Sequence, residues 1–198
     1  MKTSRILSVG CVVLGLIFTQ CNANSQERPT IPDQAKALIQ SFSVDLKSEL
    51  QKAIKEGGLK NAISVCSEKA PSIAEKYSHN EWIIKRTSLK IRNPANVATD
   101  FERDIILQFQ VKKDEGIPIS ELSYYEKEIT ESGQVHRMMK AIPTQALCLG
   151  CHGENLSEEV KSELKLRYPN DQATAFKEGD IRGAFSLLYN EIDKEIDT

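Results

Sequence analysis

Two cysteines three residues apart, followed directly by a histidine, constrain this chain more than any other feature of its sequence. The run is Cys148-Leu149-Gly150-Cys151-His152. Cys-x-x-Cys-His is the attachment sequence of c-type haem. The thiols can add to the vinyl groups on one edge of a porphyrin, and the next side chain can then reach the iron. The motif therefore predicts one covalent haem c, attached through Cys148 and Cys151, with Nε2 of His152 as an axial iron ligand.

Two other kinds of site use closely spaced cysteines. A structural zinc site needs four ligands, usually including a second Cys or His pair, and the 198-residue sequence contains no second Cys-x-x-Cys. A thioredoxin-like redox pair follows a strand in a βαβ unit and does not require the histidine. Both interpretations explain less of the run than haem attachment does.

The first 23 residues have the anatomy of a secretory signal, which agrees with the attachment of c-type haem outside the cytoplasm. A basic start is followed by a mostly apolar run from Ile6 to Phe18, which is too short for a bilayer span of ~20 residues. Cleavage after Ala23 by an ordinary signal peptidase and lipidation of Cys21 both stay open. We expect an exported, periplasmic protein, either soluble or anchored to a membrane only through lipid on Cys21.

Hydrophobic periodicity predicts helices in the first part of the mature chain. Apolar residues recur at three- and four-residue steps from Pro32 to Glu56, and Gly57-Gly58 ends that helix. A second helical stretch follows from Leu59 to about Tyr77. The other expected elements are Trp82–Lys90 as an extended segment, Asp100–Phe109 as a helix capped by Asp100, a hairpin of Ser123–Ile129 with Val135–Ala141, a turn at Pro169-Asn170-Asp171 and a short final element punctuated by Gly179-Asp180 and Gly183.

These elements predict an α+β fold in which N-terminal helices pack on a small antiparallel sheet. We expect one domain from about residue 33 to 195, after a signal peptide at 1–23 and a polar linker at 24–32. Lys and Arg total 26 against 28 Asp and Glu, so we expect no surface for nucleic acid. The sequence has neither a phosphate-binding loop nor a Ser/His/Asp set, and we do not expect an enzyme.

A haem iron with one histidine has a further axial position, and the candidate ligands are Cys66, His79, His136, Met138 and Met139. Cys66 differs from the others, because haem attachment would use both of its possible disulfide partners. A lone thiol in an oxidising compartment is either buried or used. Ala62 and Ala70, one turn on either side, would let a flat ring approach that helix face. From the residues alone, ligation by Cys66 and simple burial both stay open.

The propionates of a haem need cationic or hydrogen-bonding partners where they are poorly solvated. Arginine can bind a carboxylate through two parallel hydrogen bonds. The candidate partners are Arg86, Lys90, Arg92, Asn93 and Arg182. For each of them the alternative is a solvated position at a strand edge.

Several segments together give the chain a resemblance to a known family. They are Ala62-Ile63-Ser64-Val65-Cys66 with Ala70-Pro71, Arg86-Thr87-Ser88-Leu89-Lys90-Ile91-Arg92-Asn93-Pro94-Ala95-Asn96, Tyr124-Tyr125, Cys148–Gly153, and Tyr168-Pro169 through Gly179-Asp180-Ile181-Arg182-Gly183. From about Ala35 to Leu188 the sequence resembles c-type haem proteins with a PAS-like haem domain and His/Cys axial ligation. The resemblance implies a PAS-like sheet, and it implies Cys66 as the thiolate partner of His152.

Three functions are compatible with these expectations. Iron with two protein ligands binds a small molecule only if one ligand leaves, so the first is a sensor in which redox state, NO or CO displaces Cys66. The alternative is a low-potential electron-transfer cytochrome that docks a redox partner protein, since thiolate ligation depresses the reduction potential. The third is haem storage or a structural role. The sequence does not separate the first two.

Overall fold

The computed structural model describes residues 28–131 and 133–192. The expected signal peptide at 1–23 and residues 24–27 of the expected linker lie outside these residues. The elements are, in chain order, α1 (Ile31–Tyr77), β1 (Trp82–Thr87), the 3-10 helix η1 (Pro94–Asn96), α2 (Asp100–Asp114), η2 (Ile119–Glu121), β2 (Ser123–Thr130), β3 (Gly133–Pro143), α3 (Ala146–His152), α4 (Glu158–Arg167) and β4 (Ile181–Ile192). The described part of the chain contains one antiparallel sheet of order β1-β4-β3-β2. The α+β prediction is confirmed.

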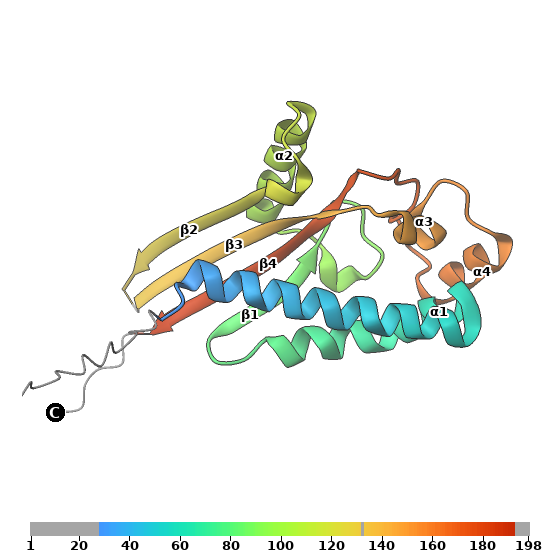
Figure 1. The fold of residues 1–198 in the computed structure, drawn as a ribbon, viewed down its shortest axis with the longest axis horizontal. Helices are drawn as coiled ribbons and strands as arrows, with labels where there is room; N and C mark the ends of the chain where they lie inside the picture. The colour runs from blue at the N-terminus through green and yellow to red at the C-terminus, as the bar shows by residue number, and fades with distance from the viewer. Residues whose placement is uncertain (1–27, 132, 193–198) are drawn as a thin grey trace, which may run out of the picture.

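The long α1 is a helical hairpin whose two halves run back along each other (Figure 1). Gly57 and Gly58 leave helical geometry between the halves, and Gly58 has a φ of 69°, where glycine is favoured. Where the second half ends, the carboxylate of Asp45 in the first half pairs with Lys76 at 2.7 Å and accepts a hydrogen bond from Tyr77 at 2.8 Å. The prediction of two helices separated by the glycine pair is confirmed.

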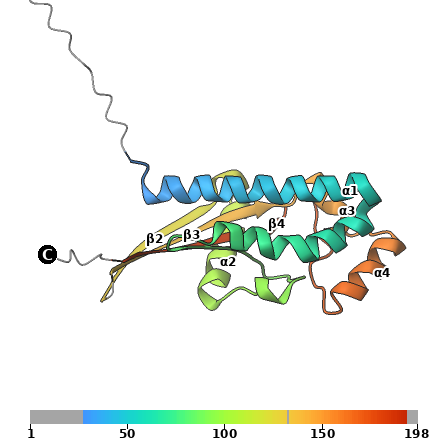
Figure 2. The ribbon, with the colours of Figure 1, turned by 90° about the horizontal axis from the view of Figure 1, so that it is seen from below.

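The sheet lies between the α1 hairpin and α2 (Figure 2). Neighbouring residues of a strand point to opposite faces. Met139 and Ala184 belong to the core under α2, whereas Met138 and Phe185 belong to the core under α1. The central strands β3 and β4 therefore contribute side chains to both cores.

Two elements differ at their ends from the expected ones. α2 is capped by Thr99 rather than Asp100, because Thr99 and Glu102 form a reciprocal capping box. The helix continues past Phe109 to Asp114, and Lys112 and Lys113 in its last turn complement the helix dipole. β1 ends at Thr87 rather than at residue 90, because the next backbone N–H, that of Ser88, donates to the carbonyl of Asn96 instead of to a strand.

The final element is the largest difference from the expectation. Instead of a short piece it is the 12-residue strand β4, which lies in the middle of the sheet between β1 and β3. Gly183 lies where β4 meets the end of β1. A Cβ at this position would lie 2.2 Å from the carbonyl oxygen of Thr87, and the glycine has a φ of 153°. The glycine therefore permits a backbone approach that no side chain would allow.

We expect Gly183→Ala to lower the free energy of unfolding by roughly 2–5 kcal/mol, since it adds both backbone strain and a steric clash. Urea unfolding of the variant and of Gly116→Ala measures this effect. Gly116 also has a positive φ, 92°, but a Cβ there meets nothing within 4 Å. The free energy of unfolding of the control should fall by only about 1–2 kcal/mol. An equal fall in both variants would show that the close approach to Thr87 does not contribute to stability.

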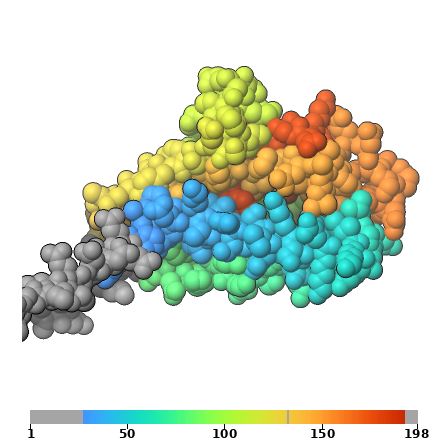
Figure 3. All heavy atoms as spheres, viewed as in Figure 1, coloured from blue at the N-terminus to red at the C-terminus, as the bar shows by residue number. Residues whose placement is uncertain are grey.

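The helices α3 and α4 lie beyond one end of the sheet, next to the turn of the α1 hairpin (Figure 1). The space-filling view shows the teal part of α1 in contact with this orange segment (Figure 3). Ile63 of α1 packs there with Val160 and Leu164 of α4. In residues 28–131 and 133–192, no helix combines the length and apolar character that a bilayer span requires.

Candidate functional site

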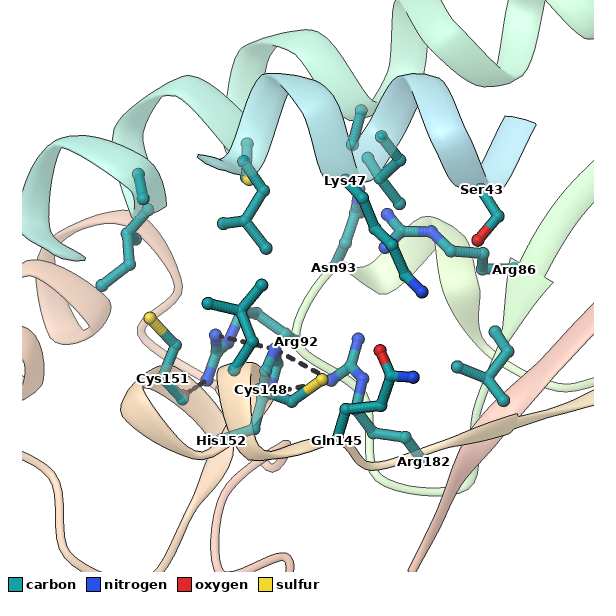
Figure 4. Close-up of a pocket in the computed structure, with 18 of the residues that line it drawn as sticks. Ser43, Lys47, Arg86, Arg92, Asn93, Gln145, Cys148, Cys151, His152 and Arg182 are labelled. Carbon is teal, nitrogen blue, oxygen red and sulfur yellow. Dashed lines mark hydrogen bonds between the residues drawn. The ribbon is translucent and has the colours of Figure 1, made fainter. Parts of the chain in front are cut away.

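A cavity of about 250 Å³ lies between the α1 hairpin, α3, the start of β4 and the segment from the end of β1 to η1. Figure 4 shows α1 on one side, with Ser43 and Lys47, and the chain around α3 on the other. Cys148, Cys151 and His152 line this cavity together with Cys66. Residues that are more than eighty positions apart in the sequence, Cys66 and the Cys-x-x-Cys-His run, therefore share one site.

The short helix α3 presents the Cys-x-x-Cys-His run to the cavity. Residues three and four positions apart share a helix face, so Cys148 lies on the same side as both Cys151 and His152. Gly150, between the cysteines, permits close packing on α1, since a Cβ there would lie 3.0 Å from the side chain of Leu59. Burial raises the pKa of the Cys151 thiol.

His152 directs one ring nitrogen to the backbone and the other to the cavity. Its Nδ1 lies 2.6 Å from the carbonyl oxygen of Ala173, which can only accept, so Nδ1 carries the ring proton and donates it. Nε2 then holds the lone pair. Nη1 of Arg182 lies 2.9 Å from Nε2 and 2.8 Å from Nδ1, and Nη1 of Arg92 lies 3.3 Å from Nε2. Burial, followed by the charges of Arg182 and Arg92, holds the pKa of His152 well below its ordinary value. A neutral imidazole with an unprotonated Nε2 is the form that binds a metal.

Arg86, Arg92 and Arg182 bring three guanidinium groups to the same cavity. Arg92 pairs with Asp171 at 3.0 Å. In the described part of the chain, the other arginines in ion pairs are Arg103, Arg137 and Arg167, so Arg86 and Arg182 have no carboxylate partner there. Burial, followed by the charges of the other two arginines, lowers the pKa of Arg182 to about 10. Two half-buried cations without a carboxylate partner suit an anionic ligand.

Cys66 lines the cavity from the second half of α1, between the buried Ala62 and Ala70. Burial raises the pKa of its thiol, and the charge of Arg86 opposes that rise. The other candidate ligands do not line the cavity. Met139 lies in the core under α2, and His136 is buried between the hydroxyl of Tyr125 and the carboxylate of Glu191, at 2.9 and 3.2 Å. The structure thus brings Cys66, and none of the alternatives, to the side of His152.

Two of the predicted polar residues, Lys90 and Asn93, differ in their position relative to the cavity. Lys90 is exposed and does not line the cavity: its Nζ lies 4.5 Å from the ring centre of Phe176 and donates to the carbonyl of Thr174. The position of Lys90 therefore differs from the prediction that placed it among the ligand-binding residues. Asn93 does line the cavity, and its side-chain oxygen accepts the backbone N–H of Ala95, which shapes the start of η1.

Sequence reasoning missed several residues of the site. The sequence predicts Asp171 only as part of a turn. The turn is confirmed, because the N–H of Asp171 donates to the carbonyl of Tyr168. Its role beside Arg92 depends on a contact across 79 residues, which no local pattern predicts. The remaining missed lining residues include Ser43, Lys47 and Gln145.

Within the described ranges, no group of three or more His, Cys, Asp or Glu side chains could hold a bare metal ion. The cavity instead combines two adjacent thiols, a histidine nitrogen, a third thiol and guanidinium groups over an apolar wall that includes Leu46, Leu50 and Leu59. This donor set fits a flat, apolar and anionic metal complex that is attached through sulfur.

Comparisons with known proteins agree with this fold. The crystal structure of the cyanobacterial heme-protein Tll0287 matches the present structure with a TM-score of 0.57 and 21% sequence identity, over 83% of this chain and 98% of that chain. No curated protein matches the chain. The model of the Tll0287-like family matches residues 22–189, which is most of the sequence. The chain therefore belongs to the Tll0287-like family.

Proposed function

We propose that this protein binds one haem c, attached covalently through Cys148 and Cys151, with His152 as an axial iron ligand. One observation carries the proposal: Cys148, Cys151 and His152, whose Nδ1 is engaged by the carbonyl of Ala173, line one cavity with an apolar wall. The match to a protein described as a heme-protein supports the same conclusion. The bound haem would supply an iron that changes its redox state and binds small gases.

We propose Cys66 as the second axial iron ligand and a PAS-like haem domain as the fold that holds the group. The support is that Cys66 lines the cavity and that His136 and Met139 are engaged elsewhere. Arg86 and Arg182 neutralise the propionates in this proposal, since both line the cavity, are half-buried and have no carboxylate partner in the described residues.

The role that we propose is sensing of redox state or of a small gas such as NO or CO, in an exported, periplasmic protein that is soluble or lipid-anchored through Cys21. Two protein ligands on one iron favour this role, because release of Cys66 would open a binding position and change the cavity at once. A low-potential electron carrier with a redox partner protein is the alternative. It predicts that Cys66 stays bound in both redox states.

Haem attachment can be tested on the wild-type chain, produced with its own signal segment and a c-type haem attachment system. We expect one haem per chain, and the reduced pyridine complex should have the absorption band of a haem with two thioether bonds. A colourless product, or the band of a haem with intact vinyl groups, would contradict the proposed function.

A further inference from the structure

We propose that Asp171 and Arg92 form a pair that positions His152 through the carbonyl of Ala173. The inference rests on the proposed function in one respect, that His152 is the iron ligand. Neither residue of the pair needs to touch the haem for this role. Asp171 is a positioning residue, and it is not among the site residues that the sequence predicts.

The two carboxylate oxygens of Asp171 have separate tasks. Oδ1 accepts the backbone N–H of Ala173 at 2.8 Å, and Oδ2 accepts from Nε of Arg92 at 3.1 Å and lies 3.0 Å from Nη2 in the ion pair. The side chains of Arg92 and Asp171 are only 13% and 9% exposed, so solvent weakens their pairing little. Asp171 thus fixes both Arg92 and the backbone of Ala173.

Arg92 connects this segment to α3. Its Nη2 donates to the carbonyl of Cys151 at 2.6 Å and to the carbonyl of Ala173 at 3.3 Å. The carbonyl of Ala173 also accepts the Nδ1–H of His152 at 2.6 Å. The backbone on both sides of the imidazole is therefore held by one guanidinium group, and this arrangement fixes which ring nitrogen faces the cavity.

Charge pairing separates Arg92 from the two other arginines of the cavity. Asp171 neutralises Arg92, so this guanidinium is occupied by a carboxylate of the chain itself. Arg86 and Arg182 have no such partner in the described residues and are left for the propionates. The three arginines thus have two distinct roles, although the sequence presents them alike.

The test measures solvent exchange of the His152 Nδ1–H by NMR on the purified full chain with isotope-labelled histidine. We expect slow exchange in wild type. Asp171→Asn, which keeps the Ala173 contact but removes the charge, should accelerate this exchange about tenfold or more, as should Arg92→Gln, because hydrogen bonds to charged groups are the stronger ones. The matched control is Glu154→Gln, since Glu154 lies two residues after His152 in an exposed pair with Lys177 at 3.7 Å.

Backbone amide exchange in β3 and β4, measured on the same samples, separates positioning from general stability. Faster exchange at the ring N–H, with unchanged strand amides and an unchanged control, supports the proposal. An unchanged ring N–H in Asp171→Asn, or an equal acceleration of the strand amides, would overturn it. The exchange measurement needs only the chain's own atoms. If the wild-type protein carries no haem, the proposed function is contradicted, but the exchange rates still decide the role of Asp171.

Discussion

Replacing Cys148 and Cys151 together with serine is expected to remove all covalently held haem. Both thiols lie on the cavity side of α3, three residues apart, and they are the attachment points of the proposed thioether bonds. Each single variant should keep one bond and give a less stable holoprotein. The measurement is extraction of the denatured protein with acidified acetone, followed by haem staining of the residue.

The wild-type protein should retain its pigment through the extraction, whereas the double variant should release all of it. Cys66→Ser is the matched control, because it removes the third thiol of the same cavity and leaves both attachment points intact. Complete extraction of pigment from wild type, or its retention by the double variant, would rule out attachment through these two residues.

Cys66→Ser is expected to change the iron site more than any other single substitution. A thiolate is a strong donor to ferric iron, and the metal favours its deprotonated form. Its loss should convert the ferric spectrum from low-spin towards high-spin or water-bound. The midpoint potential should rise, because ferric iron loses an anionic ligand that stabilised it. CO should also bind the ferrous variant faster than wild type, since no ligand has to leave.

Ferric EPR, potentiometry and the kinetics of CO binding measure these three changes. Met138→Leu is a suitable control, because Met138 was a candidate ligand from sequence but packs in the core under α1. An unchanged ferric EPR signature in Cys66→Ser would exclude Cys66 as the ligand. Wild-type ferrous protein that binds neither CO nor NO, with Cys66 still bound to iron, would favour the electron-carrier alternative over sensing.

Local chemistry explains which parts of the fold could be predicted from the sequence. The helical hairpin follows from apolar periodicity and from two adjacent glycines, all of which act within a few residues of one another. The β2–β3 hairpin likewise joins neighbouring segments. β4 could not be recognised, because it pairs with β1, about one hundred residues earlier in the chain, and because Gly183 within it resembles a turn until the contact with Thr87 is known.

The residues of the candidate site likewise fall into those that the local sequence predicts and those that only tertiary contacts bring together. The sequence by itself determined the arrangement of the Cys-x-x-Cys-His run, since the spacing of Cys148, Cys151 and His152 is set by the covalent chain and by one short helix. Only the tertiary structure decided that Cys66, rather than His136 or Met139, shares their cavity. It also decided that Arg92 is paired with Asp171 while Arg86 and Arg182 are not. These choices depend on how α1, α3 and β4 pack together, and contacts over such sequence distances leave no periodic or local signal in a single chain.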